Sequence, residues 1–431
     1  MKRIELQPRI HLNVMALNKF KTNYICIEFQ MPLAAETASL YALVPKVLTR
    51  GCRQYPSLTS LARRAEELYG TNIRAYSFKS GEGQTVALAA YPLSNEYALD
   101  DTDIFGETVD LMEQLLLDPV LQDGVFLPEY VESEKKNLID TIHGEIDNKT
   151  GYALRQTIRK MCRGEAYAVD GNGTIADVEA ITPESLTKAW KTILQEAKIE
   201  IWAIGNIDED TLQKQLRRMF AAFPPIDAAP ITTLIKREGP ETPAVYEEKM
   251  MMQQGKLVLG FRSGLVLADG IDRYTAFSVF LSVYGSGTTS KLFMNVREKL
   301  SLCYYCAAGA DSLKGIMYVQ SGIDPINYEI AKNEILTQLR MVQEGQITDE
   351  EIENAKIGMI NRCREIGDEA GSLKNWYSTR QLAGRFDSPE EYIQAIQAVT
   401  KEQIIQSAKG VSLDMIYFLH GESEPSAEGK E

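Results

Sequence analysis

Histidine is scarce in this chain, which has three in 431 residues: His11, His143 and His420. No two of them lie three or four residues apart. The H-x-x-E-H and H-E-x-x-H motifs, which place two histidines on one helix to hold zinc, are therefore both absent. A zinc site built on either motif is excluded by the sequence itself.

An excess of positive charge is also missing. The chain has 46 Lys and Arg against 60 Asp and Glu, for a formal net charge of -14. Proteins that bind nucleic acids need a basic surface that neutralises phosphates. We therefore expect no nucleic-acid partner.

The sequence has no long apolar run. None approaches the roughly 18 consecutive apolar residues that a membrane-spanning helix needs. Charged and polar residues interrupt positions 1–11, where a signal peptide would need an apolar core. We expect a cytoplasmic protein that makes no membrane contact.

Cysteine is present but does not form a disulfide pattern. The six cysteines lie mostly in apolar segments, as Cys26, Cys52, Cys162, Cys303, Cys306 and Cys363. Thiols in such places usually act as small hydrophobic side chains. Cys303 and Cys306 have the C-x-x-C spacing of redox and zinc sites, but their segment is strand-like and has no second pair or nearby histidine. We interpret this pair as structural.

The chain reads as two related halves. Each half begins with an alternating strand pattern followed by a long helical stretch, and ends with a Thr-capped helix followed by an apolar strand. Thr182 precedes Pro183 at the first helical position, and Thr400 with Gln403 has the spacing of a capping box. The matching segments are 25–29 with 257–261, and 201–205 with 416–421.

A Pro-rich connector separates the halves. Because proline disfavours both helix and sheet, residues 226–243 are predicted to be a linker. The predicted domains are then 1–225 and 244–421, with a polar tail at 422–431. Each half mixes strands with helices without strict alternation, which indicates an α+β fold with a mostly antiparallel sheet covered by helices.

A Gly-rich turn opens the most distinctive segment of the second half. Gly285, Ser286 and Gly287 precede a predicted amphipathic helix that carries Arg297, and a Tyr-rich strand follows with Tyr304. The turn lacks the Lys-Ser/Thr pair that a phosphate-binding P-loop requires. Its chemistry alone indicates a structural turn.

Over nearly its whole length the chain resembles the pitrilysin/insulinase family of metallopeptidases. The resemblance rests on segments 68–75, 290–293 and 296–299. It implies duplicated α+β halves of the LuxS/MPP metallopeptidase type, with 1–225 as a degenerate peptidase domain. It also implies that the Gly-rich turn faces a peptide chamber, so that Gly285, Ser286 and Gly287 bind substrate.

The chain departs from this family at the metal. Ala42 and Lys46 stand where active relatives have histidines, Pro45 stands at the catalytic Glu, and Thr141 at the third ligand. Alanine offers no donor atom and a protonated lysine cannot bind zinc. We expect this chain to bind no metal or other cofactor.

The resemblance assigns the remaining chemistry to the second half. In heterodimeric members of the family, one subunit holds zinc and the other contributes an Arg and a Tyr, which correspond to Arg297 and Tyr304. A Tyr hydroxyl can stabilise the negative charge that forms on the substrate carbonyl, and an Arg can anchor the substrate. Ser301 replaces the glycine that the family usually has before this strand.

The resemblance therefore implies a subunit that is inactive alone and works with a zinc-bearing H-x-x-E-H sister on unfolded peptides. One alternative is a non-catalytic peptide-binding or scaffold protein with the same fold. Another is a self-sufficient hydrolase with a rebuilt metal or serine site. A homodimer in isolation stays open. Taken singly, Arg297 also fits a surface residue paired with Glu298 or Glu353, and Tyr304 an ordinary strand aromatic.

Overall fold

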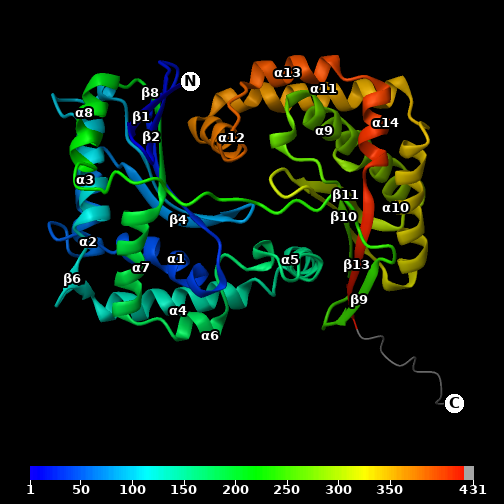
Figure 1. Ribbon diagram of the computed structural model, residues 1–431, viewed down its shortest axis with the longest axis horizontal. Helices are drawn as coiled ribbons and strands as arrows, with labels where there is room; N and C mark the ends of the chain where they lie inside the picture. The colour runs from blue at the N-terminus through cyan, green and yellow to red at the C-terminus, as the bar shows by residue number, and fades with distance from the viewer. Residues whose placement is uncertain (422–431) are drawn as a thin grey trace. The chain divides into compact units, whose positions relative to one another are not determined.

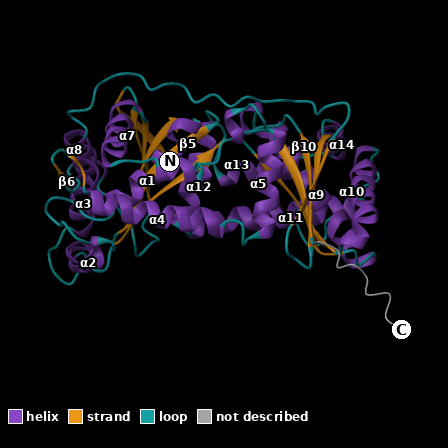
Figure 2. Cartoon of the chain, turned by 90° about the horizontal axis from the view of Figure 1, so that it is seen from below, coloured by secondary structure: helices purple, strands orange, loops and turns teal. Residues whose placement is uncertain are grey.

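The computed structural model describes residues 1–421, which form two compact units. In each unit helices pack against one sheet (Figures 1 and 2). Both units are built from segments that are discontinuous in sequence. Unit 1 comprises Met1–Gly144, Val169–Thr233 and Glu369–Asn375, and unit 2 comprises Glu145–Ala168, Leu234–Asp368 and the chain from Trp376 onward.

The sheet of unit 1 has the strand order β1-β2-β8-β3-β5-β4. Neighbouring strands are antiparallel except β2 and β8, which run parallel. Its strands are β1 (Lys2–Gln7), β2 (Ile10–Ala16), β3 (Tyr24–Pro32), β4 (Asn72–Ser80), β5 (Gly83–Tyr91) and β8 (Lys198–Gly205). A short hairpin of β6 (Leu121–Gln122) and β7 (Val125–Phe126) stands apart from this sheet.

The helices of unit 1 cover one face of this sheet. Thr182 caps α7 through a capping box with Ser185, with Pro183 at the first helical position, which confirms the predicted start of that helix. The helices are α1 (Ala35–Leu48), α2 (Leu58–Glu67), α3 (Ile104–Leu117), α4 (Pro128–Gly144), α6 (Ile175–Glu179), α7 (Pro183–Glu196) and α8 (Glu209–Met219).

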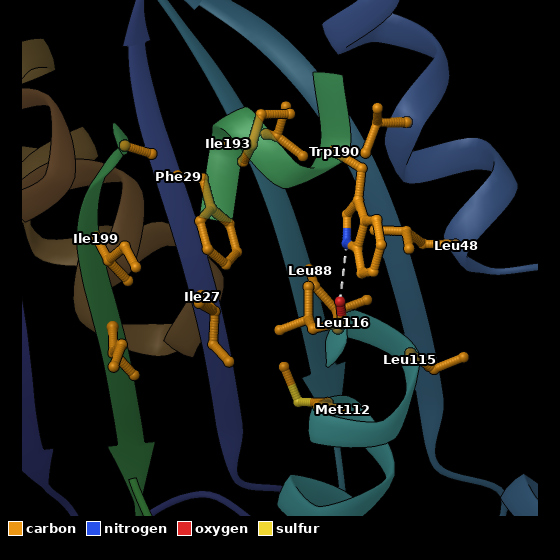
Figure 3. Close-up of a cluster of buried hydrophobic side chains, with 14 of the residues drawn as sticks. Ile27, Phe29, Leu48, Leu88, Met112, Leu115, Leu116, Trp190, Ile193 and Ile199 are labelled. Carbon is orange, nitrogen blue, oxygen red and sulfur yellow. Dashed lines mark hydrogen bonds between the residues drawn. The ribbon is translucent and has the colours of Figure 1, made fainter. Parts of the chain in front are cut away.

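The core of unit 1 lies between β3 and these helices (Figure 3). Alternate residues of β3, including Ile27 and Phe29, point into it because side chains alternate along a strand. Trp190 of α7 fills the space beside Leu48, and its indole N–H donates to the carbonyl of Leu116 at 2.9 Å. Each such buried large apolar side chain stabilises the fold by about 1.5–3 kcal/mol.

The sheet of unit 2 has the order β11-β12-β10-β13-β9, antiparallel except for the parallel pair β13 and β9. Its strands are β9 (Ala244–Lys249), β10 (Gly255–Arg262), β11 (Cys303–Asp311), β12 (Ile316–Ile323) and β13 (Ser412–His420). The other helices of the chain are α5 (Lys149–Met161), α9 (Ile271–Gly285), α10 (Tyr328–Gln343), α11 (Asp349–Glu365), α12 (Ala370–Leu382), α13 (Pro389–Ala398) and α14 (Lys401–Lys409). No helix within residues 1–421 is both long enough and apolar enough to cross a membrane.

The two sheets repeat one topology. The order β2-β8-β3-β5-β4 in unit 1 corresponds to β9-β13-β10-β12-β11 in unit 2, with the single parallel pair at the same place. The segments that were matched from the sequence fall on β3 with β10 and on β8 with β13. The prediction of duplicated α+β halves with mostly antiparallel sheets is therefore confirmed.

Each sheet is also covered on its second face, and by a helix from the other half of the sequence. In unit 2, α5 packs Ala153 against Val258 and Tyr417. In unit 1, the start of α12 supplies Lys374 to the face opposite Ile27. The two compact units are defined by contacts in the structure. The domains 1–225 and 244–421 are instead predicted from the sequence repeat, and this division into domains stays a prediction. The predicted tail at 422–431 lies outside the described residues.

A buried ion pair joins α12 to the sheet of unit 1. Lys374 contacts one carboxylate oxygen of Glu28, and the other accepts the indole N–H of Trp202 at 3.0 Å. Burial lowers the pKa of Lys374, but nearby acidic groups, Glu28 among them, outweigh it and raise the pKa above its ordinary value. Lys374 is therefore charged, and Glu28 depends on it for compensation inside the protein.

Replacing Lys374 with alanine should destabilise unit 1 by about 3–5 kcal/mol, because the carboxylate of Glu28 would stay buried without a counter-charge. The double variant Glu28→Gln with Lys374→Met should lose much less, since it removes both charges and keeps the volume. Urea unfolding followed by tryptophan fluorescence measures both. Equal losses in the single and double variants would contradict this role for the ion pair.

Candidate functional site

The positions matching the zinc motif lie on α1 in unit 1. Ala42 and Pro45 are buried, and Ala42 belongs to the hydrophobic core. Lys46 is half-buried in the last turn of the helix. These positions of α1 serve packing. Ala42 and Pro45 offer no metal-binding side-chain atom, and Lys46 carries an ammonium group.

The position matching the third ligand lies on α4. Thr141 is exposed, and its hydroxyl donates to the carbonyl of Asn137 at 2.8 Å. The buried acidic group of α4 is Glu134, which accepts from Arg50 at 3.1 Å. Residues 1–421 contain no cluster of three or more His, Cys, Asp or Glu placed to hold a metal ion. The residues at these positions do not fit zinc.

The Gly-rich turn follows α9 and is shaped by packing. A Cβ on Gly285 would lie 2.6 Å from the Cβ of Ala308 on β11, so glycine lets α9 approach that strand. Gly287 has a φ of 134°, which other residues rarely adopt. The predicted substrate-binding role of Gly285, Ser286 and Gly287 stays a prediction, and Gly285 also has this structural reason.

Arg297 lies on η4 (Leu292–Lys299), a π-helical segment. Its guanidinium lies 4.5 Å from the centre of the Phe293 ring, and its Nε lies 3.6 Å from Glu298 Oε1. The side chain is 41% exposed, so the ion pair leaves part of the guanidinium accessible. π-helical segments are rare and often occur at functional sites.

The turn between η4 and β11 has a left-handed residue at Ser301, with a φ of 52°. Glycine adopts this conformation without steric cost, which fits the glycine that the family resemblance implies at this position. The N–H of Leu300 donates to Asn295 O and that of Leu302 to Val296 O, at 3.2 and 3.1 Å. These bonds hold the turn, so Ser301 keeps the backbone shape that glycine would give.

Tyr304 is the extra residue of a β-bulge. Cys303 lies opposite Ile323 of β12 and Tyr305 lies opposite Gly322, so the register leaves Tyr304 unmatched. Tyr304 is 80% exposed. Tyr305 is half-buried, and its hydroxyl lies 3.2 Å from that of Thr150 on α5. Of the two tyrosines, Tyr304 is the one that is presented to solvent.

The structure brings together one part of the predicted site. Arg297 and Tyr304 flank the Ser301 turn in unit 2, and η4 packs against β11. The Gly-rich turn meets the same strand through Gly285. The four positions of the lost zinc site belong to unit 1. No pattern in the sequence indicates the bulge and the π-helical segment that shape this region.

The Ser301 turn predicts the effect of two substitutions. Ser301→Gly should leave stability unchanged or raise it by up to about 1 kcal/mol, because relief of the left-handed backbone is partly offset by the entropy of glycine in the unfolded chain. Ser301→Val should lower it by about 1–3 kcal/mol, since a β-branched residue is poorly tolerated there. Urea midpoints compare the two variants, and equal midpoints would show that the left-handed conformation is not required.

Comparison with known proteins identifies the relatives of this chain. Residues 180–359 match the family model described as the peptidase M16 inactive domain. The chain is 30% identical over 412 residues to the "Probable inactive metalloprotease YmfF" of Bacillus subtilis, covering 95% of both. It is 24% identical to the "Uncharacterized zinc protease YmxG" of the same organism, covering 81% of this chain and 85% of that protein.

A solved structure is also similar. A conserved protein from Enterococcus faecalis V583 superposes with a TM-score of 0.91 at 28% identity, covering 99% of both chains. The resemblance to the pitrilysin/insulinase family is thus confirmed along nearly the whole chain. The chain belongs to the M16 peptidase family, as a homologue whose sequence contains neither the H-x-x-E-H nor the H-E-x-x-H zinc motif.

Proposed function

We propose that the chain is the non-zinc subunit of a two-subunit zinc metallopeptidase. It supplies a peptide-binding surface together with Arg297 and Tyr304, and it is inactive without a zinc-bearing partner. The observation that carries this proposal is the exposed Tyr304 on its bulge, across the Ser301 turn from the partly exposed Arg297, in a chain where Ala42, Lys46 and Thr141 stand at the expected metal positions.

The two side chains suit the stabilisation of a charged carbonyl oxygen. Tyr304 can donate a hydrogen bond from its hydroxyl, and the guanidinium of Arg297 can donate to a substrate carbonyl or carboxylate. A donor aimed at developing negative charge in a closed site lowers the barrier by about 2.7–4 kcal/mol. Neither group activates water, so hydrolysis requires chemistry that this chain does not contain.

The sheet edges offer a place for the peptide. β4 is an edge strand in unit 1, and β11, which carries Tyr304, is an edge strand in unit 2. Edge strands present backbone N–H and C=O groups that an extended peptide can pair with, as an added strand. A peptide added along β11 would lie on the strand that holds Tyr304.

The partner in this proposal carries the H-x-x-E-H motif that this chain lacks. The family includes relatives named as zinc proteases that align over most of this chain. The second candidate function is a non-catalytic peptide-binding or scaffold protein. The contacts of Arg297 with Phe293 and Glu298 favour it, because they give this residue a structural role without any substrate.

The test combines the chain with a zinc-bearing H-x-x-E-H family member from the same genome and follows cleavage of an unfolded fluorogenic peptide. Each protein alone should be inactive, and the mixture should be active. Tyr304→Phe should lower turnover by about 10²–10³-fold, the effect of removing one oxyanion donor. The matched control is Tyr97→Phe, which removes the hydroxyl of an exposed tyrosine in unit 1 and should change nothing.

Size-exclusion chromatography of the same mixtures shows whether the pair forms. Full turnover with Tyr304→Phe in an assembled pair would rule out the catalytic contribution and leave the scaffold function. Cleavage by the chain alone would contradict the proposal outright.

A further inference from the structure

The bulge in β11 changes the relation between two cysteines. In a regular strand, residues three apart point to opposite faces of the sheet. Cys303 lies opposite Ile323 and Cys306 lies opposite Ser321, and these two β12 residues are two positions apart, on one face. Because Tyr304 is the extra residue, both cysteines lie on the face that packs into the apolar core of unit 2.

We propose that Cys303 and Cys306 are a reactive dithiol that exchanges with small-molecule disulfides and closes into a disulfide around Tyr304. Cys303 is the attacking thiol and Cys306 the resolving thiol. This assignment stands apart from the proposed peptidase role, since it concerns the chemistry of the two sulfur atoms alone.

The exposure of Cys303 distinguishes this pair from the other four cysteines, which are buried. Cys303 is partly exposed, and Cys306 is only 4% exposed. A reagent in solution therefore reaches Cys303 first. Cys306 can then react only with the mixed disulfide that has formed on Cys303. The other cysteines are all buried, as Cys26, Cys52, Cys162 and Cys363.

The two thiols interact with each other and with a shared neighbour. A side-chain hydrogen bond from Cys306 lowers the pKa of Cys303 to about 7 against the opposing effect of burial, with Ser321 and the positive charge of Arg297 adding to it. The same hydrogen bond, together with burial, raises the pKa of Cys306 well above its ordinary value. Cys303 is thus the more acidic thiol and Cys306 the less acidic one, the order that an attacking and a resolving cysteine need.

The exchange balances with a small disulfide as the oxidant. The Cys303 thiolate attacks one sulfur of the small disulfide, which breaks its S–S bond and releases one thiolate. Cys306 then loses its proton and attacks the Cys303 sulfur, and the second small thiolate leaves. The Cys303 thiolate and the Cys306 thiol are oxidised to a disulfide, and one small disulfide is reduced to one thiolate and one thiol, with the proton of Cys306 passing to the second small thiolate that leaves.

The experiment treats the native full chain with oxidised glutathione, quenches with acid and analyses the tryptic peptide 300–314, which holds both cysteines. The wild-type peptide should lose two hydrogen atoms and carry no glutathione. Cys306→Ser should keep one glutathione on Cys303, because the resolving thiol is gone. Cys303→Ser should remain unmodified, and Cys363→Ser is the control that behaves as wild type.

A stable glutathione adduct on Cys303 in the wild type would overturn the proposal, because Cys306 would then be unable to reach it. Absence of any modification would overturn it as well. A second measurement needs no variant: the alkylation rate of Cys303 by iodoacetamide should rise with pH with a midpoint near 7. A midpoint near the ordinary value of about 8.5 would contradict an activated thiol.

Discussion

Strands β3 and β10 are buried on both faces, and this requires two different coverings for each sheet. One face is apolar and meets helices from the same half of the sequence. The other face carries charge: Glu28 in unit 1, and Arg262 in unit 2, which donates to Asp414 at 2.7 Å and pairs with Glu165. A buried charge is tolerated only with a counter-charge, and a segment from the opposite half of the sequence supplies Lys374 to the first sheet and Glu165 to the second. Neither half covers both faces of its sheet with its own residues, so the compact units are discontinuous in sequence.

Because the helices stabilise each sheet by packing against it, the fold does not need a metal site on α1. The helix that would carry the motif, α1, is needed as a cover for the sheet, and Ala42 and Pro45 suit that purpose. The region around Tyr304 differs, since the π-helical segment, the left-handed Ser301 and the bulge fall within residues 292–305. Such backbone features are common at functional sites. Arg297 and Tyr304, the two residues of the proposed catalytic role, lie in this irregular segment.

The features that could be predicted from the sequence are local or repeated. The caps at Thr182 and Thr400 depend on residues three positions away, and the duplicated strands depend on alternation within a few residues. The lost metal positions follow from the identity of Ala42 and Lys46 alone. The ion pair of Glu28 with Lys374 joins residues far apart in sequence, and no local pattern indicates it. The bulge at Tyr304 inserts one residue without changing composition, so the strand-like pattern of this segment does not indicate it.

The central claim is that this chain depends on another protein for its metal. The most direct test is the zinc content of the purified chain, measured by elemental analysis after brief chelation and readdition of one equivalent of zinc. The account predicts that less than about a tenth of an equivalent is retained, because Ala42, Lys46 and Thr141 supply no ligand set. Retention close to one equivalent would contradict it, and the chain would then be a metalloenzyme in its own right.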